Sequence, residues 1–237
     1  MKKFTVIFSA LCFLVTTAFT GGEVCNGNDF FQQGVKSKMG YYSADGNQTG
    51  SGTSEVTKVY TSGDSTVAVL NSSYTDLKSN KSQPSEVKMI CVNGLFVMDM
   101  SGAMNQAMAG HNFKMVCNGN MVGYKQSYTV GEKLDSINMK MDMYMNDALF
   151  TTTDVRIYNR VVESYDNLIV PAGTFKCYKI SYMSAGTTTM KGKTFPGNKP
   201  TKSVMYYCPK VGMVKMETYA ADDKLFSYSQ LLELTKP

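Results

Sequence analysis

The chain has 237 residues and a formal net charge of +5, and its lysines are scattered rather than clustered. A charge this small and dispersed is typical of a solvated surface and does not indicate a nucleic-acid partner. The length is consistent with a signal peptide at residues 1–20 followed by a single β-rich domain at residues 21–237.

The first twenty residues have the pattern of a secretory signal peptide. Two lysines precede an apolar run, Phe4–Val15, and small residues follow, so cleavage is expected near Ala18 or Thr20. The run is shorter than the roughly 20 apolar residues of a membrane-spanning helix, and no second long run occurs. Cys12 follows Leu11 rather than a small residue, which argues against a lipid anchor. We therefore expect a soluble exported protein, periplasmic or extracellular, that does not span a membrane after cleavage.

Short β-rich runs separated by Gly, Asn, Asp and Ser dominate the rest of the chain, which is the all-β pattern. The turn sequences between them, such as ADGN, TSGD and VNG, supply residues that tolerate positive φ. GNQTGSG at residues 46–52 is interpreted as a turn connection rather than a phosphate loop, because no helical pattern follows it. The expected strands are Lys36–Ser43, Ser54–Thr61, Ser65–Ser73, Glu86–Cys91, Leu95–Asp99, Lys133–Tyr144, Phe150–Glu163, Asn167–Val170, Phe175–Met183, Ser203–Tyr207, Met213–Thr218 and Leu225–Leu234.

The stretch YDNLIVPAGTFKCYKI, residues 165–180, contains two apolar segments around a compact turn. Pro171 presets φ at the second turn position and Gly173 relaxes the exit. We therefore expect this segment to have a structural role and not a catalytic one.

Five cysteines remain after cleavage, and export makes disulfides feasible. If Phe175–Met183 pairs with Ser203–Tyr207 across the loop near residues 194–200, Cys177 and Cys208 are equidistant from the middle of that loop. The sequence then predicts a cross-strand disulfide between Cys177 and Cys208.

One short helix is expected at Ser101–Gly110, with Ser101 as N-cap and Gly110 as C-terminal stop. About ten residues are too few for an isolated helix, so it should pack on the sheet.

Methionine alternates with polar residues in NMKMDMYMND, residues 138–147. Because a strand sends alternate side chains to opposite faces, these thioethers are expected on one face. The segment at residues 95–100 repeats the pattern more weakly. The expected ligand-lining residues are Phe96, Met98, Met104, Met108, Met139, Met141, Met143 and Met145.

Three interpretations of the methionines compete. They can be core filler between sheet and helix, or they can line an adaptable apolar cavity for a hydrophobic guest. The third is a Cu(I) site that uses Met141 and Met143, or Met104, Met108 and His111.

Apart from the Cu(I) alternative, the sequence indicates no catalytic residues, metal ligands or cofactor. His111 is the single histidine and has no nucleophile motif beside it, and zinc-binding spacings are missing. Acidic residues are numerous enough for a carboxylate pair, but there is no Trp on which a sugar ring could stack. We therefore predict a protein that is not an enzyme.

Three segments together resemble the exported TapB-like domains of unknown function found in Gram-negative envelopes. They are CVNGLFVMDM at residues 91–100, ESYDNLIVPAGTFKCYKI at residues 163–180 and YYCPKVGMVKMETY at residues 206–219. The resemblance implies a fold similar to the periplasmic lipoprotein carriers LolA and LolB. That fold is mainly β, a curved antiparallel sheet forming an unclosed half-barrel, with one or two short helices packed in the concave side. It implies no catalytic residues.

The leading functional hypothesis is a non-enzymatic exported protein that binds a lipid or a hydrophobic peptide in a methionine-rich hollow. The alternatives are a structural or assembly protein that contacts an envelope partner, and a Cu(I)-binding periplasmic module.

Overall fold

The computed structural model describes residues 28–99, 113–119, 123–197 and 199–237, and most of them lie in one antiparallel sheet of 15 strands. The strands are β1 (Lys36–Ser43), β2 (Gln48–Ser62), β3 (Ser65–Asp76), β4 (Lys81–Val92), β5 (Leu95–Asp99), β6 (Phe113–Gly119), β7 (Gly123–Lys125), β8 (Lys133–Leu134), β9 (Ile137–Met145), β10 (Ala148–Val170), β11 (Gly173–Met190), β12 (Lys193–Pro196), β13 (Thr201–Cys208), β14 (Gly212–Tyr219) and β15 (Leu225–Thr235).

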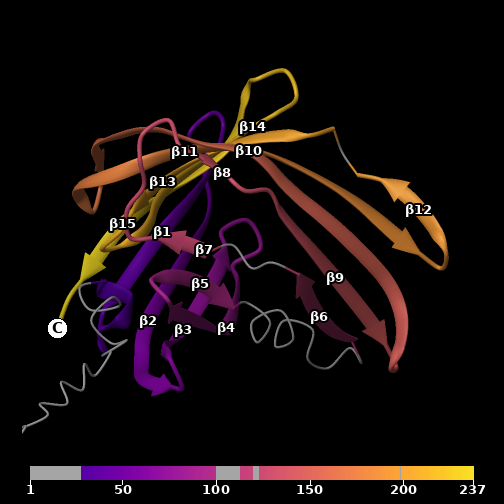
Figure 1. Ribbon diagram of the computed structural model, residues 1–237, viewed down its shortest axis with the longest axis horizontal. Helices are drawn as coiled ribbons and strands as arrows, with labels where there is room; N and C mark the ends of the chain where they lie inside the picture. The colour runs from indigo at the N-terminus through magenta and orange to yellow at the C-terminus, as the bar shows by residue number, and fades with distance from the viewer. Residues whose placement is uncertain (1–27, 100–112, 120–122, 198) are drawn as a thin grey trace, which may run out of the picture.

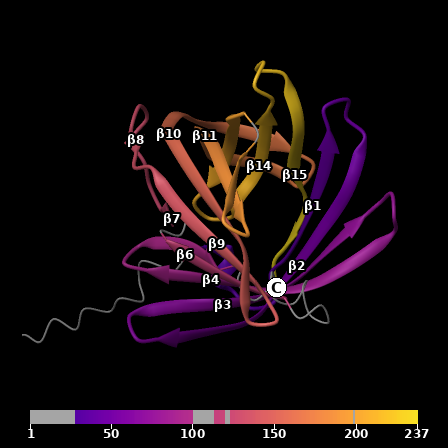
Figure 2. The same ribbon diagram turned by 90° about the vertical axis from the view of Figure 1, so that its right-hand side faces the viewer.

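The strand order is β6-β9-β10-β11-β13-β14-β15-β1-β2-β3-β4-β5-β7, with β8 also paired to β10 and β12 to β11. The terminal strands β6 and β7 pair with β9 and β5 and not with each other, so the sheet is unclosed. Figures 1 and 2 show a curved sheet in which the long β9–β12 arm and the β1–β5 strands diverge from each other. The expected fold class, a mainly β half-barrel, is confirmed.

Helical structure in the described part of the chain is a single 3-10 turn, η1 (Asp29–Phe31), capped by the Asn28 side chain, which accepts a hydrogen bond from the Phe30 N–H at 2.9 Å. The ring of Phe31 packs against Phe96 with centroids 5.7 Å apart. The helix expected at Ser101–Gly110 lies outside the described residues. None of the helices in the described ranges is long and apolar enough to cross a membrane.

The turn in the VPAG stretch is confirmed. Val170 ends β10 and pairs directly with Gly173, the first residue of β11, whose φ is +131°. Pro171 and Ala172 form the two-residue connection, and the Ala172 N–H donates to the carbonyl of Leu231 at 3.3 Å. The turn thereby also ties the hairpin to β15.

The interpretation of residues 46–52 as a turn connection is confirmed at Gly46 and Asn47, which lie in the turn between β1 and β2, and is wrong from Gln48 onward. β2 begins at Gln48 and pairs with both β1 and β3 through Gly50 and Gly52. A Cβ at Gly50 would lie 2.6 Å from the hydroxyl oxygen of Tyr74, and one at Gly52 would lie 3.3 Å from the Tyr41 ring. The glycines therefore make room for two rings that pack edge to face with centroids 5.4 Å apart.

Other strand boundaries differ from expectation in a consistent way. β1 and β5 match, whereas the expected Lys133–Tyr144 strand is divided into β8 and β9, and two expected strands merge into β10. β6, β7 and β12 were not anticipated. Each of them is short and lies at an end of the sheet or beside a long partner, so pairing rather than local sequence holds it in place.

Residues 123–134, called here the closing segment, run from the β5 end of the sheet to β10. β7 pairs with β5, and β8 pairs with β10 through Leu134 and Lys133. Within the segment, Tyr124 stacks on Tyr207 at 5.0 Å and Tyr128 meets the edge of Tyr178 at 5.2 Å. The segment covers the core formed by strands β10, β11 and β13.

The Tyr207 hydroxyl is buried in this core without a hydrogen-bond partner among the described residues, whereas the Tyr128 hydroxyl accepts the Lys125 N–H at 2.8 Å. An unpaired buried hydroxyl costs stability and a paired one contributes roughly 1 kcal/mol. We expect Tyr207→Phe to leave the free energy of unfolding unchanged or to raise it. Tyr128→Phe, the matched control, should lower it by about 1 kcal/mol in denaturant titrations. A Tyr207→Phe variant less stable than Tyr128→Phe would contradict this account.

Candidate functional site

Strand β9 places its four methionines on one face, as the alternation predicted. Met139, Met141 and Met143 are half-buried and Met145 is exposed. Directly opposed residues of an antiparallel pair share a face, so the register extends this face to the neighbouring strands.

Two cross-strand rows define the extent of this face. In one row, Met143 lies opposite Met115 of β6 and Thr151 of β10, and Thr151 lies opposite Met190 of β11. In the other row, Met141 lies opposite Cys117 and Thr153, and the row continues through Thr188 to Phe195 of β12. The apolar members of this surface, called here the methionine face, are Met115, Met139, Met141, Met143, Met145, Met190 and Phe195.

The methionine face is continuous with the hydrophobic core. Even-numbered side chains of β11 share one face: Tyr178 and Ile180 are fully buried in the core, and Met190 at the far end is 38% exposed. On β10 the same face passes from buried Val162 to half-buried Val155. The core face thus runs outward beyond the part that the closing segment covers, with Phe195 46% exposed at its edge.

The opposite face of the same strands is polar. Asp142 is buried there and accepts a hydrogen bond from the Thr152 hydroxyl at 2.6 Å and a longer one, 3.5 Å, from the Asn118 amide. Lys140 lies 3.9 Å from the same carboxylate. These contacts join β6, β9 and β10 and fix their register.

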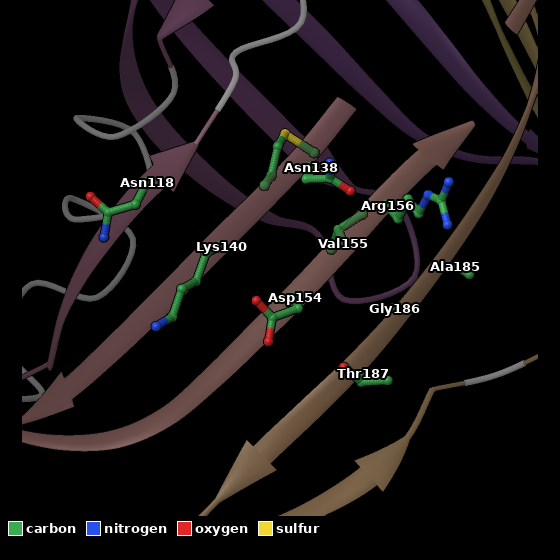
Figure 3. Close-up of a pocket in the computed structure, with 10 residues that line it drawn as sticks. Asn118, Asn138, Lys140, Asp154, Val155, Arg156, Ala185, Gly186 and Thr187 are labelled. Carbon is green, nitrogen blue, oxygen red and sulfur yellow. The ribbon is translucent and has the colours of Figure 1, made fainter. Parts of the chain in front are cut away.

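A pocket of about 520 Å³ lies on these strands and is lined mainly by the polar face (Figure 3). Its charged residues are Lys140, Asp154 and Arg156, and Arg156 also stacks over the Tyr158 ring at 5.3 Å. Asp154 is the single carboxylate in the lining, so the pocket lacks the carboxylate pair that glycoside hydrolysis uses.

The structure separates the predicted lining residues into three groups. The four methionines of β9 are together on the methionine face. Phe96 is 1% exposed and packs in the core beside Cys91, whereas Met98 on the same strand is 45% exposed. β5 and β9 lie near opposite ends of the strand order, so the sheet does not join these two sets. Met104, Met108 and His111 lie outside the described residues.

A family model for DUF3108-like domains matches residues 32–231, which is most of the chain and nearly the whole described sheet. The chain belongs to the DUF3108-like family. This is a family of domains of unknown function, which agrees with the sequence resemblance to such a domain. The narrower resemblance to TapB-like domains and lipoprotein carriers stays a prediction.

Two solved structures share the fold of this DUF3108-like domain. One is a Bacteroides fragilis protein described as exported and as having a YmcC-like fold, with 21% identity and a TM-score of 0.64 over 86% of this chain and 97% of its own. The other, described as a lipoprotein from Parabacteroides distasonis, has 23% identity and a TM-score of 0.65 over 88% of this chain and 99% of its own. No curated protein is significantly similar to the chain.

Sequence reasoning missed part of the methionine face of this DUF3108-like domain. Met190 and Phe195 lie in a Thr- and Lys-rich stretch that reads as a loop, and Met115 lies in a strand that was not anticipated. In the sequence, the apolar character of Met115, Met190 and Phe195 was the one indication that they could belong to this surface. Their assignment to the same face requires the strand register with β9 and β10.

The predicted Cys177–Cys208 disulfide is not formed in the structure. β11 and β13 pair in the expected register, with Tyr178 opposite Tyr207 one step from the cysteines, but both cysteines are free thiols. Cys91 is instead the described cysteine that is disulfide-bonded. Spacing therefore predicted the proximity of Cys177 and Cys208 and not their covalent state.

The two buried thiols contact each other through a hydrogen bond, and the Cys177 thiol also donates to the Phe175 carbonyl oxygen at 3.6 Å. The bond between the two thiols, together with the backbone N–H groups of Lys210 and Val211, lowers the pKa of Cys208 to about 6. The same hydrogen bond, with burial, raises the pKa of Cys177. The hydrogen bond therefore moves the pKa values of the two thiols in opposite directions.

We expect a thiolate absorbance step at 240 nm near pH 6 in a Cys117→Ser protein, and none there after the further change Cys208→Ser. The folded pKa of Cys208 lies below its unfolded value of about 8.5, so the stability it contributes should be lost as pH falls through about 6. Cys177→Ala, which removes the hydrogen-bond donor, should move the step to higher pH. A step that stays near pH 8.5, or no titrating thiols at all, would show that this account of the pair is wrong.

Proposed function

We propose that this DUF3108-like domain is a non-enzymatic exported protein that binds the acyl chain of a lipid on its methionine face. The observation that carries the proposal is the continuity of that face with the core. The same side of β10 and β11 is filled under the closing segment and half-exposed beyond it.

The side chains of the methionine face suit an apolar ligand of variable shape. Methionine is unbranched and polarizable, so it adapts to irregular surfaces, and methionine-rich surfaces are used for promiscuous apolar binding. Thr153 and Thr188 lie in the Met141 row, between Met141 and Phe195, with their hydroxyl oxygens 3.3 Å apart. One of these hydroxyls donates to the other, and an acyl chain laid across them would leave that hydrogen bond in place.

No cluster of catalytic side chains was found in the described ranges, and this favours a binding role over catalysis. The pocket on the polar face offers one carboxylate, Asp154, and no histidine or cysteine among its lining residues. The two related structures are of proteins described as exported and as a lipoprotein, which agrees with a role in the cell envelope.

The protein purified from the periplasm of its native host should carry a lipid mass in native mass spectrometry. The delipidated protein should take up a fluorescent fatty acid. The double change Met141→Gln and Met143→Gln keeps side-chain length but buries two amides under the chain, and should weaken uptake by about tenfold or more. Met213→Gln, on the exposed part of β14, is the matched control and should bind as the native protein does.

An empty native mass together with no fatty-acid uptake would overturn the lipid proposal and favour a structural or assembly role. Equal uptake by the double variant and the native protein would show that the ligand binds elsewhere.

A further inference from the structure

We infer that Cys117, together with Met115, Met141 and Met143, forms a binding site for Cu(I) at the β6–β9 end of the sheet. The inference is independent of the lipid proposal, because it depends on the sulfur atoms of these residues and not on their apolar area.

The strand register brings the four sulfur-bearing side chains to one face. Cys117 lies opposite Met141, and Met115 lies opposite Met143. Directly opposed Cβ atoms in an antiparallel pair are about 5 Å apart, and diagonal neighbours are about 7 Å apart. Cys117 is thus directly across from one thioether and diagonal to a second, and each methionine has rotatable bonds with which its sulfur can reach the same ion.

The donor set selects the metal. Thiolate and thioether sulfurs are soft ligands that favour Cu(I) over hard divalent cations. In the described ranges, no three His, Cys, Asp or Glu side chains cluster closely enough to hold a metal ion, so a site for a harder cation has no comparable basis there.

Cys117 is exposed and is not in a disulfide, so a metal ion can reach its sulfur from solvent. The Asp99 carboxylate lies near the thiol. Cu(I) binding replaces the thiol proton of Cys117: the S–H bond breaks, the S–Cu bond forms and one proton is released. The negative charge of Asp99 favours the approach of the cation.

A second pair of thiols could also take up Cu(I), namely Cys177 and Cys208 in the core. The test must separate the two. We would therefore titrate the full chain carrying Cys177→Ala and Cys208→Ala, with Cu(I) supplied anaerobically in competition with the chromogenic chelator bicinchoninate.

This protein should remove one equivalent of Cu(I) from the chelator, and X-ray absorption should show sulfur neighbours alone. Adding Cys117→Ser or Met141→Leu should weaken Cu(I) binding by more than about 100-fold. Changing a residue that only supports a metal ligand weakens metal binding by up to about 100-fold, so the loss of a ligand itself should cost more. Met213→Leu is the control thioether and should have no effect. In the protein with native cysteines, Cys117→Ser should lower the Cu(I) stoichiometry by one, which covers the case in which the double alanine variant fails to fold.

Met141→Leu also separates this site from the lipid site, because leucine keeps the apolar volume and removes the sulfur. Loss of Cu(I) with fatty-acid uptake unchanged supports the metal site. Failure to compete with the chelator, or equal Cu(I) affinity in the Cys117→Ser and Met141→Leu proteins, would overturn it.

Discussion

Strand β11 keeps its even-numbered side chains on one face from the core to its exposed end, and the rest of the structure depends on that alternation. Strand β10 maintains it across a bulge: Ile157 pairs with Ser184 before the irregularity and Val162 pairs with Ile180 after it, with Asn159 at positive φ between them. Without the bulge, Val162 and Val155 of β10 would lie on opposite faces of the sheet.

Where the chain itself specifies a strand or a turn, sequence predicted the fold well. The VPAG turn, the bounds of β1 and β5 and the alternating methionines of β9 all follow from side-chain period and turn chemistry, which are local properties. The misses have non-local causes. Gly50 reads as a turn residue but makes room for a ring from another strand, and Phe195 joins the methionine face only through its pairing with Thr188. The state of the cysteine pair depends on its surroundings and not on its spacing.

The two faces of the β9–β10 arm have different roles: contacts on the polar face fix the strand register, and the methionine face is the proposed binding surface. On the polar face, the buried Asp142 carboxylate and its partners Thr152 and Asn118 hold three strands in one register. On the other face, that register aligns thioethers from β6 and β9 beside each other. Methionine serves two kinds of contact there, since its body is apolar and its sulfur is a soft ligand. A lipid chain and a Cu(I) ion bound on this face would therefore compete for the same side chains.

The claim that the methionine face lies open beyond the core is tested most directly by oxidising the ligand-free, folded protein with hydrogen peroxide and following each methionine by peptide mass spectrometry. Met139, Met141 and Met143 should form sulfoxide faster than Met205 and Met89, which are buried in the core. If the three methionines of β9 are protected as strongly as Met205, the face is covered in the native protein, and the proposed binding surface does not exist.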